Sequence, residues 1–341
     1  MELDSRKLKI LSEIVRLYIK TGEPVGSKAL VDCLDYQISS ATIRNDMSEL
    51  SQLGFLIQPH TSAGRIPSHI GFRLYIDNLL EKRELSADEK KNIDKFLKSK
   101  FDSPEKLIEY ASLYLAKTTG CASISTTPTA DKDKIAGIEI VKIGDRAIVV
   151  LVISTANIMK SKMCRVDFEL TAQALTYISA LLKDKLVNER LEDIDIVKIQ
   201  TIAAGLGEYT LALTPILLTA YEIIKMFSEN KVLLEGQSNL FYYKELSESI
   251  AQLFDFLSNN RGLLNIIDDV DNGVNVVIGK ETNHDELAES SMLFAKYNFC
   301  DTKSGTLGLI GPTRIDYAKL IPYLEYFTSS MGNILEHEFF K

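Results

Sequence analysis

A polar stretch, residues 39–67, carries the side chains whose types and spacing best suit recognition of nucleic acid. Ser39 or Ser40 is a good helix N-cap, and apolar residues recur at helical spacing between Ile43 and Leu53, so one narrow stripe is expected to be buried. The opposite side of this helix carries short donors and acceptors and one arginine: Ala41, Thr42, Arg44, Asn45, Ser48 and Gln52. Such side chains can enter a major groove and reach base edges.

The residues after this helix predict a strand and a shaped loop. Gly54 is expected to end the helix, Phe55–Ile57 forms a β-like run, and the segment from Pro59 to Pro67 reads as a loop whose glycine and prolines set its shape. Its donors are His60, Thr61, Ser62 and Arg65. Such a loop can follow phosphates or put Arg65 into a minor groove.

The elements that must position this stretch come before it. Residues 5–21 form an amphipathic pattern that ends at Gly22, and Ser27 is expected to cap a short helix, Lys28–Leu34. The order of helix, helix, turn, helix and hairpin is that of a winged helix-turn-helix, which adds Lys28 and Ser40 to the candidate DNA contacts. A winged helix that binds protein fits the same pattern, because the fold does not fix the function.

Composition and charge suit a cytoplasmic protein of about two domains. The 341 residues are 45% hydrophobic and 25% charged, and the net charge is −8. Residues 1–80 hold nine Lys/Arg and nine Asp/Glu; the remaining 30 Lys/Arg and 38 Asp/Glu carry all of the net charge. A neutral head indicates modest affinity for DNA per head, with tight binding needing two heads.

The rest of the chain predicts an α+β multidomain protein. Residues 68–100 read as helix, with a charged run that is either a solvated face or a semi-rigid connector, and a further helix begins at Ser103-Pro104. Strand patterns before about residue 168 and after about residue 272 flank a helix-rich block. A sheet domain that carries an insertion explains this order.

Catalytic and cofactor motifs are absent from the sequence. Gly305, Gly308 and Gly311 match neither dinucleotide nor P-loop spacing, and no two of the four histidines lie at metal-ligand spacing. The four cysteines are widely spaced with no CxxC, and no nucleophile setting is recognisable. We therefore expect no enzyme activity, no cofactor and no metal, and the lack of an 18-residue apolar run gives no reason to expect a membrane partner.

Several blocks in order resemble one protein family. PVGSKAL, SSATIRNDMSELSQLGFLIQPHTSAGRIPS and GFRLYIDNLL are similar to the N-terminal signature of the HrcA family of bacterial heat-inducible transcription repressors, and LLEGQSNLF, VIGKE and GTLGLIGPTRIDYAKLIPYLEYF are similar to its later blocks. The resemblance runs from about residue 3 to residue 336. Ile315 stands where the family more often has methionine, which is a volume-conserving apolar swap.

The resemblance implies a domain plan and a function. The plan is a winged helix-turn-helix over 1–82, a helical linker over 83–102, a GAF-like antiparallel sheet domain over 103–168 and 272–341, and an inserted dimerising domain over 169–271. The implied function is repression of chaperone genes by a homodimer that binds the inverted repeat called CIRCE and is kept active by the GroE chaperonin.

Two other functions stay open from the sequence. One is a metabolite-gated regulator with the same architecture, whose pocket would use apolar residues from 135–153 and 274–311. The other is an enzyme with an accessory DNA-binding head.

Overall fold

The computed structural model divides into two compact units. It describes residues 3–34, 38–61, 63–127, 133–155, 158–228, 232–268, 273–299 and 303–340. The first unit comprises 1–125, 232–297 and 306–332, and the second comprises 126–231, 298–305 and 333–341. Both are α+β, and their sheets are antiparallel wherever a pairing register is resolved.

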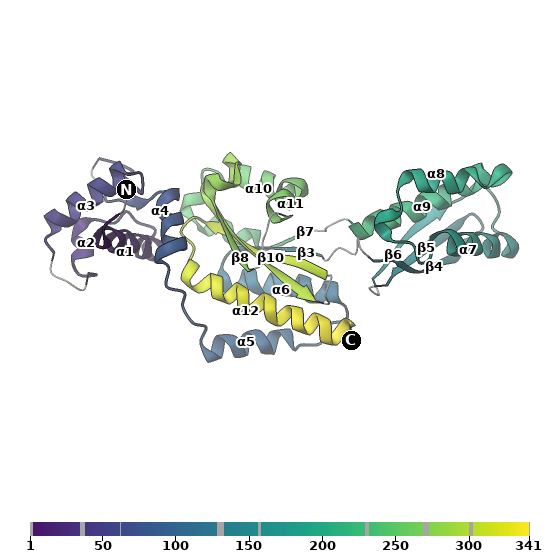
Figure 1. The fold of residues 1–341 in the computed structure, drawn as a ribbon, viewed down its shortest axis with the longest axis horizontal. Coiled ribbons are helices and arrows are strands. Elements are labelled where there is room, and N and C mark those ends of the chain that lie inside the picture. The colour runs from purple at the N-terminus through teal and green to yellow at the C-terminus, as the bar shows by residue number, and fades with distance from the viewer. Residues whose placement is uncertain are drawn as a thin grey trace. The chain divides into compact units, whose positions relative to one another are not determined.

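The first 80 residues, which we call the head, are mostly helical (Figure 1). They include a two-stranded ribbon between α3 and α4. The elements are α1 (Ser5–Thr21), α2 (Ser27–Val31), α3 (Ser40–Gln52), β1 (Leu56–Ile57), β2 (Ile66–Pro67), α4 (His69–Leu74) and a π-helical turn (Tyr75–Leu79). Asp4 caps α1, and the helix ends at Gly22 as expected from the sequence. The expected extent of the second helix is wrong: it ends at Val31, and Ser27 is its first residue rather than its cap.

The prediction of a single helix over 68–100 is also wrong. The π-helical turn ends at Leu79, and a new helix, α5 (Ala87–Leu97), begins behind Ser86. The Ser86 side chain accepts from the Glu89 N–H while the Glu89 carboxylate accepts from the Ser86 N–H, which is a capping box. Such a cap nucleates a separate helix. Ile93 on α5 is fully buried, so this charged run has an apolar face as well as a solvated one.

Five strands form the central sheet of the first unit in the order β7-β3-β10-β9-β8. The strands are β3 (Ala122–Thr126), β7 (Val232–Glu235), β8 (Val274–Ile278), β9 (Ser290–Phe299) and β10 (Lys303–Pro312). In Figure 1, α6 (Pro104–Thr119) and α12 (Tyr317–Leu335) lie along one face, and α10 (Ile250–Ser258) and α11 (Asn260–Asp268) cover the other. Strand residues such as Ile124 and Phe294 are buried against Leu253 and Leu263 of the covering helices.

The second unit has its own three-stranded sheet, in the order β4-β5-β6. Its elements are β4 (Ile135–Gly144), β5 (Ala147–Ser154), β6 (Met159–Arg165), α7 (Ala172–Leu186), α8 (Ile196–Ala204) and α9 (Thr210–Ser228). Every second residue of β5 is buried, and Val150 and Val152 share a core with Leu182 of α7 and Ile216 of α9. The helices therefore cover one face of this sheet only.

The unit boundaries differ from the domain boundaries expected from the sequence. Strands β4 to β6, expected in the sheet domain that ends at 168, belong to the second unit, and residues 232–271, expected in the insertion, belong to the first. Alternating apolar residues identify a strand but not the sheet that it joins, because pairing depends on contacts distant in sequence. The segment treated as a linker, 83–102, contains α5, which lies in the first unit.

Candidate nucleic-acid interface

Helix α3 presents one polar face to solvent because its other face is held in the head. The Ser39 hydroxyl accepts from the Thr42 N–H at 3.1 Å and caps the helix. Ile43 and Leu50 are fully buried and Met47 nearly so. The residues on the other side are exposed: Ala41, Arg44, Asn45, Ser48 and Gln52. The two faces therefore match the sequence-based expectation in part: Leu53, expected in the buried stripe, is 37% exposed, and Thr42, expected on the polar face, is half-buried.

Other expected contact residues border this face, but not all are free to reach outward. Lys28 is exposed on α2, whereas Ser40 is half-buried and its hydroxyl lies 2.9 Å from that of Ser27. The hydroxyl of Thr42 is 2.8 Å from that of Ser39. Ser40 and Thr42 therefore help to shape the start of α3 and its junction with α2.

The loop between β1 and β2 is shaped by a glutamine that the sequence did not single out. Gln58 Nε2 donates to the carbonyl oxygens of Thr61, at 3.0 Å, and Ala63, at 3.2 Å. His60 and Thr61 are exposed at this turn, and Ser62 lies outside the described residues. A Cβ added to Gly64 would lie 2.3 Å from the Val25 carbonyl oxygen, so only glycine allows this close approach.

Arg65 lies at the base of the ribbon rather than at its tip. Its N–H donates to the Val25 carbonyl oxygen at 2.8 Å, and its carbonyl accepts from the Val25 N–H at 2.9 Å. The side-chain Nε donates to Ser51 Oγ at 2.9 Å, and the residue is half-buried. The guanidinium is thus held beside the last turn of α3.

A partly buried ion pair, which the sequence did not indicate, holds α3 on α1. Arg6 Nε donates to Asp46 Oδ2 at 2.8 Å and Nη2 donates to Oδ1 at 2.9 Å, while Asp46 is only 2% exposed. This bidentate geometry sets the rotation of α3 about its axis. The local sequence gave one sign of this contact, because Asp46 lies next to the apolar stripe of α3. Its partner Arg6 is 40 residues away, so the pairing itself could not be predicted.

A second ion pair joins the same two helices at the surface. Lys7 Nζ lies 3.0 Å from Glu49 Oε2 and 2.9 Å from Asp4 Oδ2. Hydrogen bonds to the Asp4 and Glu49 carboxylates raise the pKa of Lys7. The Lys7 backbone N–H, followed by its ammonium group, lowers the pKa of Asp4. The carboxylate of Glu49 on α3 is therefore paired with an ammonium group of α1.

The pocket expected for a metabolite is not assembled from the two predicted segments. Strands β4 and β5 belong to a different sheet from β8, β9 and β10, so residues 135–153 and 274–311 do not line a common sheet face. A pocket of about 590 Å³ does exist in the first unit. Its lining holds five basic side chains, among them Arg16, Lys20 and Arg314, two acidic ones, Glu81 and Asp316, and apolar residues such as Leu320.

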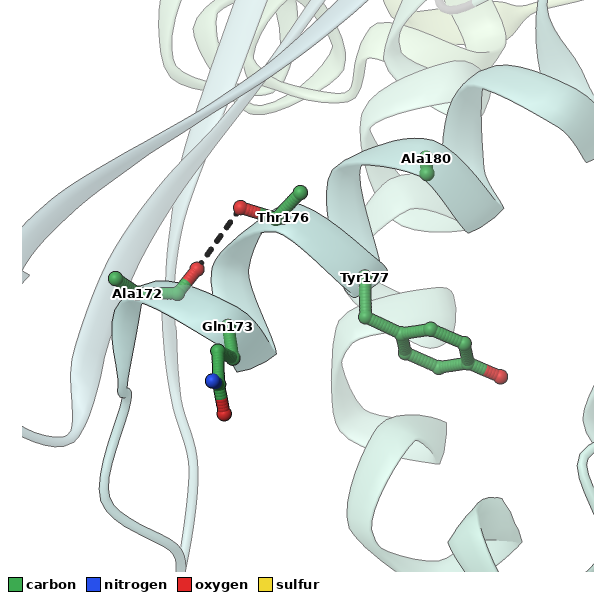
Figure 2. A pocket seen from close by; sticks show the side chains of 5 residues that line it. All are labelled: Ala172, Gln173, Thr176, Tyr177 and Ala180. Atoms are coloured by element: carbon green, nitrogen blue, oxygen red, sulfur yellow. Dashed lines mark hydrogen bonds between the residues drawn. The ribbon is translucent and has the colours of Figure 1, made fainter.

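The second unit exposes large apolar side chains. Leu211 is 90% exposed and Val197 61% exposed on its helices. A shallow hollow of about 440 Å³ lies along α7. Figure 2 shows the residues that line it, which are Ala172, Gln173, Thr176, Tyr177 and Ala180. The Tyr177 ring lies 6.1 Å from that of Tyr209. Apolar surface of this kind is typical of contacts between proteins.

One helical stretch, Gly207–Phe227, is long and apolar enough to cross a membrane by length and composition. Core helices have the same composition, and Ile216, Ala220 and Ile223 lie in the core of the second unit. Packing within the unit accounts for this apolar sequence. Among the residues that the structure describes, no group of three His, Cys, Asp or Glu side chains is arranged to hold a metal ion.

Comparison with known proteins shows the family. Residues 105–321 match the family model described as HrcA protein C terminal domain. The heat-inducible transcription repressor HrcA of Clostridium botulinum (strain Alaska E43 / Type E3) is 32% identical over 342 residues, which are 99% of each chain. The protein of the same name from Carboxydothermus hydrogenoformans is 34% identical over 340 residues, covering 99% of this chain and 100% of that one.

A solved structure has the same fold along the whole chain. It is titled as the crystal structure of a hypothetical protein at 2.2 Å resolution, with a TM-score of 0.63, 24% identity, and coverage of 98% of this chain and 99% of that one. The family match and the full-length relatives together establish that this chain belongs to the HrcA family of heat-inducible transcription repressors.

Proposed function

We propose that this protein represses heat-shock genes by binding an inverted-repeat operator of the CIRCE type as a homodimer. The observation that carries the proposal is the exposed polar face of α3, held at a fixed rotation by Arg6 and Asp46. In this proposal the head is a winged helix-turn-helix, with α2 and α3 as the motif and the β1–β2 ribbon as the wing. The five-stranded sheet with helices on both faces is its GAF-like domain.

Base contacts come from the exposed centre of α3. Arg44 carries the forked donors that suit a guanine, and Asn45 can donate to and accept from an adenine. Ala41, Ser48 and Gln52 complete this contact face. Ser40 and Thr42, in the first turn of α3, are placed beside the sugar-phosphate backbone of the DNA. Phosphate contacts come from the periphery of the head, through the residues Lys28, His60, Thr61, Ser62 and Arg65.

Two features support a homodimer: the zero net charge of the head and the exposed apolar residues of the second unit. A head with equal numbers of acids and bases gains little from non-specific attraction to phosphates, so tight binding needs two heads on one site. The exposed apolar residues of the second unit, such as Leu211 and Val197, suit a symmetric contact between two copies. Two identical heads then require an inverted repeat.

Heat can relieve repression if the folded state that binds DNA is only marginally stable. We propose that the GroE chaperonin keeps the cytoplasmic repressor folded, so that warming, or diversion of chaperonin to other clients, lowers the DNA-competent fraction. Operator binding after a heat pulse, measured with and without chaperonin, tests this point. Equal affinity in both samples would refute the chaperonin's role but not the DNA-binding role.

Alanine substitution on α3 tests the groove assignment. Arg44→Ala and Asn45→Ala are each expected to cost about 1–3 kcal/mol of operator binding and to relax the preference for the native sequence. Arg65→Ala is expected to cost less and to leave the preference unchanged, because it faces phosphates. Lys91→Ala, an exposed lysine on α5, is the matched control. Wild-type affinity in all three head variants, by mobility-shift titration, would overturn the assignment.

The metabolite-gated alternative has one supporting observation, the cationic pocket lined by Arg16, Lys20 and Arg314. Its ligand would be an anion. A thermal-shift screen of small phosphates and carboxylates separates the two functions. A ligand that raises the melting temperature and also changes operator affinity would favour the alternative.

A further inference from the structure

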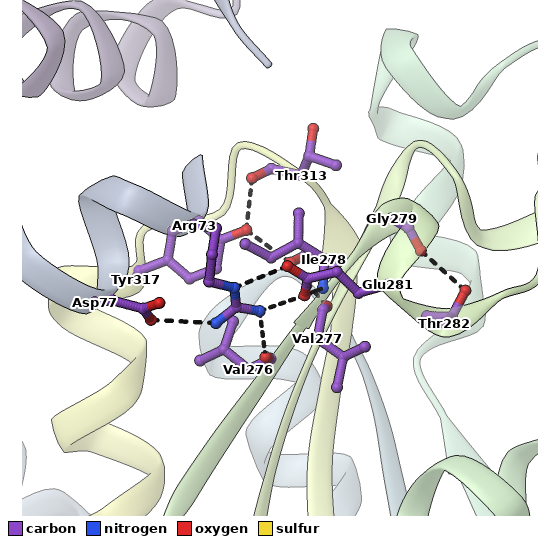
Figure 3. A network of polar contacts seen from close by, with 11 residues as sticks. Arg73, Asp77, Val276, Val277, Ile278, Gly279, Glu281, Thr282, Thr313 and Tyr317 are labelled. Atoms are coloured by element: carbon purple, nitrogen blue, oxygen red, sulfur yellow. Dashed lines mark hydrogen bonds and ion pairs between the residues drawn. The ribbon is translucent and has the colours of Figure 1, made fainter. Parts of the chain in front are cut away.

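The head is joined to the five-stranded sheet by an arginine clamp. Arg73 on α4 donates from Nε to Glu281 Oε1 at 2.8 Å, and from Nη2 to Glu281 Oε2 and to the Val276 carbonyl oxygen, the latter at 2.7 Å. Figure 3 shows these bonds converging from α4 onto the end of β8 and the turn after it. Arg73 and Glu281 are 208 residues apart, so the clamp connects two separately encoded parts of the first unit.

The sheet side of this clamp is shaped to receive the head. The Ile278 N–H donates to Glu281 Oε2 at 2.9 Å and so orients the carboxylate. Gly279 has a φ of 49°, and a Cβ there would lie 2.4 Å from both His69 Cε1 and the Ala288 carbonyl oxygen. A side chain at this position would therefore push α4 away, because His69 begins that helix.

The clamp also determines the charge state of Glu281. Burial alone would raise the pKa of its carboxyl group, but the Arg73 hydrogen bonds and the Ile278 N–H outweigh burial and lower the pKa. The carboxylate is thus ionised at neutral pH and stays available to Arg73. The clamp is a charged, two-bond contact under physiological conditions.

A second arginine holds the other end of the head. Arg314, which precedes α12, pairs with the Glu245 carboxylate and donates from Nη1 to the carbonyl oxygen of Ile19, at the end of α1, at 3.4 Å. Gly22 ends α1 at this contact, where a Cβ would lie 3.1 Å from Arg314 Nε. The head is therefore held at α1 as well as at α4.

Buried aromatic rings fill the space between these two contacts. The rings of Tyr18 and Phe72 in the head lie 6.2 Å apart, and the Phe72 ring lies 6.2 Å from that of Tyr317 on α12. Tyr317 is fully buried, with its hydroxyl 2.6 Å from that of Ser291 on β9. Two polar contacts around a packed aromatic centre make a rigid joint rather than a flexible tether.

We propose that Arg73 and Glu281 are positioning residues that fix the angle of each DNA-binding head on its sheet domain, and so set the half-site spacing that the dimer accepts. This inference rests on the proposed function. A rigid joint holds each α3 at one orientation on its own sheet domain, so an operator with the matching half-site spacing binds both heads with a smaller ordering cost. A loosened joint keeps each head intact but lowers the effective concentration of the second head.

Three DNA probes separate positioning from general damage: a half-site, the full inverted repeat, and a repeat whose spacer is longer by about 5 base pairs, roughly half a helical turn. The variants are Arg73→Ala on the head side and Glu281→Gln and Gly279→Ala on the sheet side. Glu109→Ala is the control, because it breaks an exposed ion pair with Lys106 on α6 of the same unit. Circular-dichroism melts establish that each variant is folded at the titration temperature.

The three variants are expected to bind the half-site within about 2-fold of wild type and the full repeat roughly 10-fold more weakly, with less discrimination against the longer spacer. Equal losses on half-site and full repeat, or unchanged spacer discrimination in folded variants, would overturn the positioning role. A wild-type protein that binds a scrambled sequence as well as the repeat would instead sink the proposed function. The two failures are thus distinguishable, and three variants on two sides of the joint keep the test informative if one does not fold.

Discussion

Helix α3 of the head and the second unit expose different kinds of side chain. The centre of α3 exposes Arg44, Asn45 and Ser48, while its apolar residues are buried. The second unit exposes Leu211, Val197 and Met159, the first at 90% and the other two at 61% each. One surface suits the polar edges of bases, and the other suits a protein partner.

This difference separates two tasks that a repressor must combine. In the proposed function, sequence reading is local to α3, which is held by the Arg6–Asp46 pair, and assembly is local to the second unit. A neutral head alone is expected to bind weakly, so the contribution of assembly to operator affinity should exceed that of any single base contact.

The largest effect is expected from disrupting the apolar surface of the second unit. Leu211→Asp puts a charge at the most exposed leucine and should dissociate the dimer, with a loss of roughly 100-fold in affinity for the full repeat and little loss for a half-site. Sedimentation and mobility-shift titration measure the two outcomes. Leu113→Asp, on α6 of the first unit, is the matched control because Leu113 is also an exposed leucine on a helix, at 47%. A Leu211→Asp protein that remains dimeric would show that assembly lies elsewhere.

A smaller effect is expected from removing the carboxylate that orients α3. Asp46→Ala should lower the free energy of unfolding of the head by about 1–3 kcal/mol, less than for a fully buried pair, because the Arg6 side chain is 42% exposed and can be rehydrated. Urea denaturation measures the change. Glu13→Ala removes the exposed Arg16 pair on α1 and should cost about 0.5 kcal/mol or less. Equal costs for the two variants would contradict an orienting role for Asp46.

Much of the head could be predicted from local sequence, because its signals are local. Ser39 caps α3, Gly22 ends α1, and the buried stripe of α3 follows helical spacing, so the exposed candidates were identified correctly as a face. The pairs that orient these elements were missed. Asp46 bonds to a residue 40 positions away and Glu281 to one 208 positions away, and nothing in either neighbourhood specifies the partner.

The sheet domains were harder to predict for the same reason. The sequence indicated strands before about residue 168, and the structure shows β4 and β5 paired antiparallel. Which of two sheets this pair joins is decided by its apolar face, where Val150 packs with Leu182 and Ile216. That contact involves segments up to about 66 residues apart, so local sequence does not place the edge of the unit, which differs from the boundary expected at 168.

The smallest effect is expected from pH, through Glu281. A carboxyl group whose pKa is lowered in the folded state contributes stability above its ordinary value of 4.5, and loses that contribution as pH falls through the lowered pKa. The difference in unfolding free energy between wild type and Glu281→Gln should therefore be constant near neutral pH and shrink below pH 4.5. Urea denaturation at several pH values checks this, and a gap that persists at the lowest pH would contradict the charged clamp.

Direct titration of operator DNA tests the central claim that two heads read an inverted repeat. Wild-type protein should bind the repeat at least about 1,000-fold more tightly than a scrambled sequence of the same length and composition at one stated salt concentration. The half-site should fall between the two. Equal affinity for the repeat and the scrambled duplex would contradict the account.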